Sequence, residues 1–330
     1  MKKLFFLAAA VLLSGAMQAR NWRINNIPEA KADFLSINDA MASADVLNGD
    51  VLYLDPGCRL TSRQDITKSV TVIGGGFNLS GDEMESSVKE IDIKCNDVVL
   101  RGVNITGDCR CTSSKNTGIV IERCKIAWVG GLGSLSMVIR CYITGSVSVG
   151  TNGRLYNNII LGSVTAYEGA IVKNNAIICY PYHSGEYYVV TPEKATVVDN
   201  IIINTRGGVN ANYTIENVDP SYGNEIKGNI LSNDADHVFA EHPSNSFIGA
   251  TVADVFVNEG VYDELYRLKE DSPAKGAGYT GNDCGPFDGL YPYVMSCRPK
   301  NIPYIYEAIV PNHPTDNKIT VTVKAKNQNE

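Results

Sequence analysis

Four rows of sequence decide the fold, because each row repeats the previous one after 17 residues: VIERCKI (120–126), MVIRCYI (137–143), RLYNNII (154–160) and IVKNNAI (171–177). In every row the second residue is apolar, the fifth is Cys or Asn, and the seventh is Ile. The same order recurs upstream around Leu100 and downstream at residues 197–202 and 226–231, where only the spacing changes. Such self-similarity indicates an architecture of stacked repeats.

The length and composition of the repeat select the kind of solenoid. A strand-helix-strand crossover needs about 30 residues, and leucine-rich repeats have a Leu-rich consensus of about 20 to 29 residues. The Ile and Val residues occur in short bursts, which half-buried strands favour. We therefore predict an all-β protein, a single-stranded right-handed parallel β-helix (solenoid) with an N-terminal capping helix, whose turns stack roughly 4.8 Å apart.

The fifth column of the repeat predicts a ladder of side chains at a bend. The amides of such a ladder bond one another and the turn backbone, which lacks sheet partners there. The nine cysteines match no stapled scaffold, so we interpret the two in this column as free, buried thiols rather than a disulfide. The predicted ladder residues are Cys124, Cys141, Asn158, Asn175, Asn200 and Asn229.

The N-terminus has the pattern of a signal peptide. Lys2 and Lys3 precede an apolar run over residues 4–13, and small residues lead to Ala19. The run is shorter than the about 20 residues that cross a bilayer, so we expect an exported protein without a transmembrane segment, in the periplasm, on the outer surface or outside the cell. Losing two lysines would change the formal charge from −7 to −9, and such an acidic chain disfavours a nucleic-acid partner.

The chain is predicted to have four parts: a signal peptide (1–19), an N-terminal cap (20–48), the β-helix (49–260) and a C-terminal segment with a tail strand (261–330). Residues 33–45 have the pattern of a short amphipathic helix that would cover the open end of the stacked core.

The tail strand is predicted from alternation. Ile319, Val321 and Val323 alternate with polar residues, which gives a strand one apolar face. We expect this face to pack back on the solenoid, because an unpaired apolar edge invites aggregation. The alternative is that the strand pairs with a partner chain.

Several segments resemble a known superfamily. NGDVLYLDPG (48–57) and KSVTVIGGG (68–76) look like the opening strands of pectate-lyase-like β-helices. LYRLKEDSPAKGAGYTGNDCGPFDG (265–289) and the alternating tail are similar to the closing segment of exported right-handed β-helix proteins of the Bacteroidetes type, whose function is generally unassigned. The resemblance implies the fold, which serves lyases, hydrolases, adhesins and inert surface proteins alike.

Catalytic groups of this superfamily are sought in the repeat columns. Its lyases combine calcium-binding carboxylates with an Arg or Lys base, and its hydrolases pair carboxylates about 5 to 9.5 Å apart. Asp199 is a lone carboxylate in the fourth column, and we interpret it as a solvated turn residue. The sequence therefore predicts no standard β-helix catalytic site. The third and fourth columns of the four rows hold Glu122, Ile139, Tyr156 and Lys173, and Arg123, Arg140, Asn157 and Asn174.

Two insertions supply the candidate glycan site. The row spacing grows to 25 between Asn175 and Asn200 and to 29 between Asn200 and Asn229. Aromatic faces stack on sugar rings while polar groups bond their hydroxyls; the alternative is that the tyrosines simply pack over the coil. The candidate glycan-binding residues are Tyr180, Tyr182, His183, Glu186, Tyr187, Tyr188, Arg206 and Tyr213.

A further loop has the composition of a cation site. We nevertheless expect no metal and no cofactor, because loops of acidic proteins often have such a composition; calcium is the alternative. The loop residues that would hold a divalent cation are Asp234, Asp236, His237, Glu241 and His242.

Three functions are compatible with these observations. The first is an exported monomer that contacts a polysaccharide or cell-surface glycan with little or no catalysis. The second is a polysaccharide lyase or glycoside hydrolase, for which His183, Glu186 and Arg206 would have to converge on one groove. The third is a structural surface protein whose tail strand augments another chain.

Overall fold

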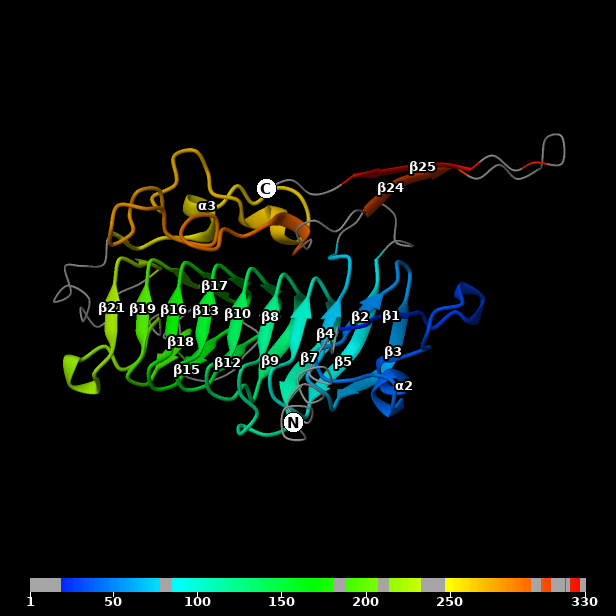
Figure 1. Cartoon of the computed structure of the whole chain (residues 1–330). Helices are drawn as coiled ribbons and strands as arrows, with labels where there is room; N and C mark the ends of the chain where they lie inside the picture. The colour runs from blue at the N-terminus through cyan, green and yellow to red at the C-terminus, as the bar shows by residue number, and fades with distance from the viewer. Residues whose placement is uncertain are drawn as a thin grey trace, which may run out of the picture.

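The repeated rows form short parallel strands, and the chain winds through them as a parallel β-helix (Figure 1). The computed structural model describes residues 19–77, 85–180, 188–206, 214–232, 247–297, 304–309, 318 and 321–326. It confirms the predicted fold class, a mostly β solenoid with a short N-terminal helix. Apart from Ala19, the predicted signal peptide lies outside the described residues.

One side of the solenoid is a ten-stranded parallel sheet, here called the front sheet. Its inward residues lie in register as the repeat predicts: Ile121 pairs with Val138, Val138 with Leu155 and Leu155 with Val172. The strands are β1 (Asn21–Ile24), β2 (Val51–Leu54), β4 (Thr71–Ile73), β6 (Val99–Arg101), β8 (Val120–Glu122), β10 (Met137–Ile139), β13 (Arg154–Tyr156), β16 (Ile171–Lys173), β19 (Thr196–Val198) and β21 (Glu225–Lys227).

The second sheet has thirteen strands and divides along the solenoid. It begins with four long strands, β3 (Arg59–Ile66), β5 (Ser87–Ile93), β7 (Asn104–Cys111) and β9 (Lys125–Gly130). One set of short strands then continues it beside the bend, here called the covered branch: β11 (Tyr142–Ile143), β14 (Ile159–Ile160), β17 (Ala176–Cys179), β20 (Ile201–Asn204), β22 (Ile230–Leu231) and β23 (Phe247–Ile248). The far branch is β12 (Val147–Val149), β15 (Val164–Ala166) and β18 (Val190–Pro192).

The bend between the front sheet and the covered branch uses a left-handed backbone. The bend residue has φ of 55° at Asn157, 53° at Asn174 and 58° at Asp199, a conformation that Asn and Asp adopt more readily than most residues. Gly228 occupies the same place in the next turn with φ of 60°. The chain therefore turns sharply after β13, β16, β19 and β21.

The predicted ladder follows immediately after the bend residue. Asn158 N donates to Asn175 Oδ1 at 2.9 Å, Asn175 N to Asn200 Oδ1 at 2.9 Å, and Asn200 N to Asn229 Oδ1 at 3.0 Å. Each amide nitrogen also donates to a carbonyl of the turn before, as Asn175 Nδ2 does to Leu155 O at 2.8 Å. The ladder is confirmed, and it satisfies backbone groups that the two sheets leave unpaired at the corner.

The thiols continue the ladder toward the N-terminus. Cys141 N donates to Asn158 Oδ1 at 2.8 Å, and Cys124 N lies 3.4 Å from Cys141 Sγ. Neither cysteine is part of a disulfide and both are fully buried, which confirms the interpretation as stacked thiols rather than a disulfide. Burial raises the pKa of the neighbouring Cys109 thiol well above its ordinary value, so that thiol stays protonated.

The inside of the solenoid is one continuous apolar core, here called the inner core. Ile126, Ile143, Ile160 and Ile177 pair in series and have no exposed surface. Direct stacking of like side chains in every turn gives close packing without a helix layer. The central prediction from the repeat is therefore confirmed.

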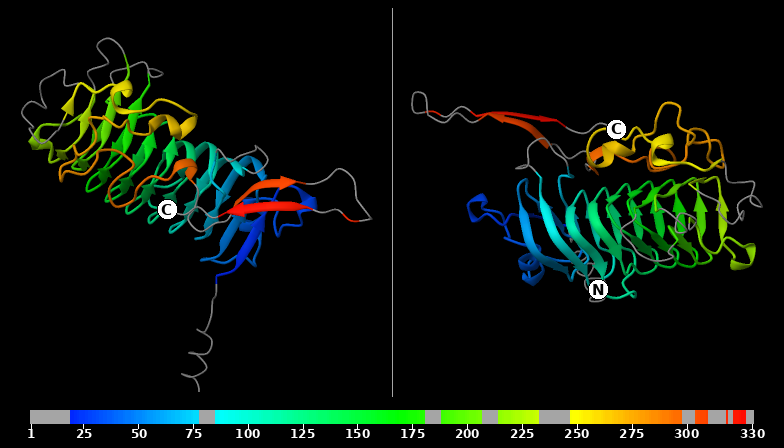
Figure 2. Two further views of the ribbon diagram at one scale, coloured as in Figure 1. Left: turned by 90° about the horizontal axis from the view of Figure 1, so that it is seen from above. Right: turned by 180° about the vertical axis from the view of Figure 1, so that it is seen from behind.

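Residues 249–297, here called the cover, lie over the outside of the solenoid (Figures 1 and 2). A second apolar core, here called the outer core, lies between the cover and the solenoid. The cover contains one short helix, α3 (Val252–Val255), and otherwise turns and loops with 3₁₀ turns at Tyr262–Tyr266 and Met295–Cys297. The solenoid contributes Phe77, Tyr142, Ile159, Ala176, Ile178, Ile201, Ile203 and Ile230, and the cover contributes Ala250, Val255, Phe256, Tyr266, Ala274, Cys284 and Tyr293.

The N-terminal end is closed by a helix and an additional strand. Helix α2 (Ile37–Ala42) begins after Ser36, whose side chain accepts a hydrogen bond from Asp39 N, and it buries Ile37 against the inner core. The helix is shorter than the predicted 33–45, and β1 precedes it in the front sheet. In the described ranges, no helix has the length and apolar character to cross a membrane.

The tail strand forms a hairpin. Strand β25 (Thr322–Lys326) pairs antiparallel with β24 (Tyr304–Ile309), and the hairpin extends away from the β-helix in Figures 1 and 2. Val321 is 49% and Val323 51% exposed. The expectation that this strand packs on the solenoid is therefore wrong, because a local hairpin partner satisfies its backbone; Ile319 lies outside the described residues.

Candidate functional site

Most of the predicted glycan residues lie outside the part of the chain that the structure describes. Tyr180, Tyr188 and Arg206 are described. The prediction that the two insertions supply a glycan site therefore stays a prediction. The loop at residues 233–242, which would hold the cation in the alternative interpretation, also lies outside the described residues. The undescribed glycan candidates are Tyr182, His183, Glu186, Tyr187 and Tyr213.

The described members of this set make internal contacts. The Tyr180 hydroxyl lies 3.2 Å from the Tyr266 hydroxyl, and the Tyr180 side chain packs against the outer core. Arg206 is only 4% exposed, and its Nε donates to Asn204 Oδ1 at 3.0 Å. Tyr188 is half-buried. Tyr180 and Arg206 thus contribute to packing in this region.

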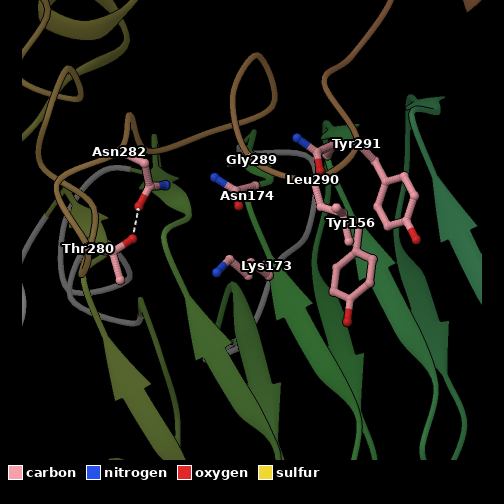
Figure 3. Close-up of a pocket in the computed structure, with 9 residues that line it drawn as sticks. Tyr156, Lys173, Asn174, Thr280, Asn282, Gly289, Leu290 and Tyr291 are labelled. Carbon is pink, nitrogen blue, oxygen red and sulfur yellow. Dashed lines mark hydrogen bonds between the residues drawn. The ribbon is translucent and has the colours of Figure 1, made fainter.

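A cavity of about 290 Å³ opens elsewhere, between the front sheet and the cover (Figure 3). Its floor comes from the last residues of β13 and β16 and from the bend residues that follow them. Its walls come from two loops of the cover. The lining residues are Tyr156, Asn157, Lys173, Asn174, Thr280, Asn282, Gly289, Leu290 and Tyr291.

Two tyrosines form the aromatic side of the cavity. The rings of Tyr156, from β13, and Tyr291, from the cover, lie 5.8 Å apart and 17° from parallel. Such a stack restrains both rings and contributes about 0.5 to 1.5 kcal/mol. Burial raises the pKa of Tyr156, so its hydroxyl keeps its proton at neutral pH and can donate a hydrogen bond.

Lys173 and Asp199 form an ion pair at the cavity floor. Asp199 Oδ2 lies 3.2 Å from Lys173 Nζ, and Asp199 Oδ1 accepts a hydrogen bond from Tyr279 N at 2.7 Å. The Asp199 side chain has no exposed surface, whereas Lys173 is 41% exposed. The interpretation of Asp199 as a solvated turn residue is therefore wrong, because the cover packs directly on this bend and excludes water from it.

The bend asparagines attach the cover to the solenoid. Asn157 Nδ2 donates to Pro286 O at 2.9 Å and to Asp288 O at 2.5 Å. Asn174 Nδ2 lies 3.3 Å from Asp283 O. Because these donors come from successive turns, the cover follows the solenoid axis and the cavity walls are fixed to its floor.

A glycine allows the closest approach of the cover to the floor. Gly289 has φ of +86°, and a Cβ there would lie 2.6 Å from Asn174 Oδ1. Any other residue would collide with the bend and strain its own backbone. The Asp288-Gly289 turn is therefore part of the cavity wall rather than a general flexible loop.

The opposite wall is polar. Thr280 Oγ1 donates to Asn282 Oδ1 at 2.7 Å, and Asn282 Nδ2 donates to Asp283 O at 3.1 Å (Figure 3). These short side chains face the tyrosines across the floor. Leu290, 78% exposed, stands at the rim.

The lining has groups that bind sugars and lacks the carboxyl pair that hydrolyses a glycosidic bond. Aromatic faces, amides and hydroxyls are the groups that recognise sugar rings and their hydroxyls. Hydrolysis of a glycosidic bond needs two carboxyl groups about 5 to 9.5 Å apart, and none of the nine lining residues is acidic. Within the described residues no group of three or more His, Cys, Asp and Glu is arranged to hold a metal ion.

Comparison with known proteins found no family model, no curated protein and no solved structure that matches this chain. The class of protein is therefore defined by its own geometry. It is a parallel β-helix with a buried Asn ladder and an aromatic and polar cavity beneath a C-terminal cover.

Four of the nine lining residues stand in the third and fourth columns of the sequence repeat. These are Tyr156, Lys173, Asn157 and Asn174, and because none is acidic, the search for a β-helix catalytic site does not point to them. The available signal was the apolar run in the neighbouring strands, such as residues 201–203, which predicts that both faces are covered. A cover on these strands lies beside the bend, and the third and fourth columns of the repeat then lie at the edge of the cover.

Proposed function

We propose that this chain is an exported β-helix protein of the pectate-lyase-like kind that binds a polysaccharide in the cavity without cleaving it. The observation that supports this function most is the Tyr156 ring, which Tyr291 supports from one side and which lines an open cavity with polar side chains opposite. An aromatic surface beside hydroxyl and amide groups matches the two kinds of surface that a sugar ring presents.

The site is preorganised for this role. Asn157 and Asn174 bond to the cover, and Asp199 bonds both to the cover and to Lys173, so the lining needs little rearrangement to accept a ligand. Preorganisation increases affinity by lowering the entropy lost on binding. The resemblance of the N-terminal and C-terminal segments to exported β-helix proteins agrees with a role outside the cytoplasm.

Binding to a panel of purified plant and host polysaccharides tests the proposal. Tyr156→Ala is expected to weaken binding at least tenfold, which corresponds to about 1.4 kcal/mol, because it removes the stacking surface. Tyr167→Ala is the matched control, since Tyr167 is 40% exposed and does not line the cavity. Failure of every glycan to bind, or equal binding by both variants, would contradict the proposal.

A third variant separates the cavity from the insertion. Tyr187→Ala is expected to leave the affinity within about twofold of the unmodified protein if the cavity is the site. A large loss in Tyr187→Ala together with normal binding by Tyr156→Ala would move the glycan site to the insertion. Release of reducing or unsaturated sugar ends during the same incubations would favour the enzyme hypothesis.

A further inference from the structure

The charge of the cavity is balanced within the protein. Lys173 is the one charged residue among the nine that line it, and its ammonium group lies 3.2 Å from the Asp199 carboxylate. Asp199 is fully buried and fixed by the hydrogen bond from Tyr279 N, so it cannot move away when a ligand enters. The floor therefore presents an ammonium group whose charge is already compensated.

Two basic side chains near the cavity, Lys227 and Arg140, also have carboxylate neighbours. Lys227 pairs with Glu225, which raises the pKa of the lysine, and Lys227 lies over the Tyr279 ring at 4.1 Å. Arg140 lies 3.6 Å from Glu122. Its guanidinium carbon is 5.8 Å from the Tyr291 ring centre, and Arg140 does not line the cavity.

We infer that the cavity selects neutral polysaccharides over polysaccharides rich in uronic acids, an inference that rests on the proposed function. A uronate carboxylate placed on Lys173 would approach Asp199 from the far side of the ammonium group and be repelled by it. The carboxylate would also lose its hydration, and no uncompensated positive charge in the lining would offset that cost. Neutral hydroxyl groups can use the tyrosine, threonine, amide and ammonium groups without this cost.

The charge of the whole chain acts in the same direction. The formal net charge is −7, so a polyanionic glycan is repelled before it reaches the cavity. Interactions between exposed charges depend on ionic strength, with a Debye length of about 10 Å at 0.1 M salt. Salt dependence of binding therefore separates recognition of a neutral ligand from recognition of an anionic one.

The test is titration of the full chain with neutral and uronate oligosaccharides of equal length at 50 mM and 500 mM NaCl. The expected result is binding of a neutral oligosaccharide with an affinity that changes less than twofold between the two salt concentrations. The uronate is expected to bind at least tenfold more weakly at low salt. Strong uronate binding that weakens with salt would overturn the inference and leave the proposed function standing.

Asp199→Asn sharpens the test. The Asn carbonyl keeps the hydrogen bond from Tyr279 N, while Lys173 loses its counter-charge, so uronate affinity at 50 mM NaCl is expected to rise at least tenfold. Adding Lys173→Gln in the double variant is expected to remove that gain. Lys194→Gln is the matched control, because Lys194 is 66% exposed, pairs with Glu168 and lies outside the cavity lining.

The outcomes separate the two proposals. A gain of uronate binding in Asp199→Asn that the double variant loses supports the inference, and no gain in a folded Asp199→Asn protein overturns it. If Asp199→Asn does not fold, the salt dependence and the neutral-to-uronate ratio of the unmodified protein still decide. Absence of binding to every glycan overturns the proposed function and this inference with it.

Discussion

The front sheet and the covered branch share the same inner core but have different outer faces. In β16 the inward Val172 stands between Ile171 and Lys173, which are both half-buried. In β20 all residues from Ile201 to Ile203 are nearly or fully buried. Both strands repeat the same inner pattern, so the difference comes only from the cover.

This difference shows how one solenoid produces a site. A sheet with one covered face alternates in polarity, whereas a sheet covered on both faces is continuously apolar. The cavity lies at the edge where the cover ends and the front sheet becomes open, so aromatic and polar groups meet there. Variants at the bend, on each outer face and inside the cover test this difference.

The largest effect is expected at the bend that joins the two faces. Asn175→Ala removes the acceptor of Asn158 N and the donor to Leu155 O, both at fully buried positions. Each unsatisfied buried group costs about 1 to 3 kcal/mol, so the free energy of unfolding should fall by about 4 kcal/mol. Urea unfolding measures this change, and a loss below about 1 kcal/mol would contradict the structural role of the ladder.

A paired substitution compares the two outer faces directly. Ile201→Ala, in the outer core, should lower the free energy of unfolding by about 3 kcal/mol, as large-to-small changes in cores do. Ile171→Ala is the matched control on the open face and should cost less than about 1 kcal/mol, since Ile171 is already half-exposed. Equal losses would show that the cover does not bury the β20 face.

A smaller, pH-dependent effect is expected inside the cover. Asp263 is fully buried and accepts hydrogen bonds from the Tyr293 hydroxyl at 2.9 Å and Ser296 N at 2.6 Å, and burial raises its pKa. The folded state therefore binds the proton more tightly than the unfolded state, whose Asp pKa is about 3.9. The stability that Asp263 contributes is complete below about pH 3.9 and is lost as pH rises through the raised pKa.

Asp263→Asn should remove this slope. Relative to the unmodified protein, the variant is expected to gain stability between about pH 4 and pH 7, by about 1.4 kcal/mol for each unit by which burial raises the pKa. Thermal unfolding of both proteins across this range measures the difference. A difference that is constant with pH would contradict a raised pKa at Asp263.

The sequence predicted the solenoid well because its cause is local and repeated. Each turn has an inward apolar residue, a bend residue and a ladder residue at the same positions. The four repeated rows, the last of which ends at Ile177, therefore predict the strand register, the ladder and the core. The buried thiols of Cys124 and Cys141, which form no disulfide, were predicted from the same column. Repetition makes a fold predictable, since one pattern is tested several times.

The cavity was less predictable because it depends on contacts between segments more than 100 residues apart. Asn157 meets Pro286 and Tyr156 meets Tyr291 only after the cover folds back along the solenoid. No periodicity in residues 249–297 predicts where that segment lies. Asp199 shows the consequence, because a polar residue at a bend looks solvated until a distant segment buries it.

The most direct test of the cavity as a glycan site is a crystal structure of the protein with the neutral oligosaccharide that binds best. A sugar ring should lie against Tyr156, with hydroxyl groups within hydrogen-bonding distance of Asn282 or Thr280. An oligosaccharide seated on the insertion at residues 180–188 or on another face, with nothing between Tyr156 and Asn282, would contradict it.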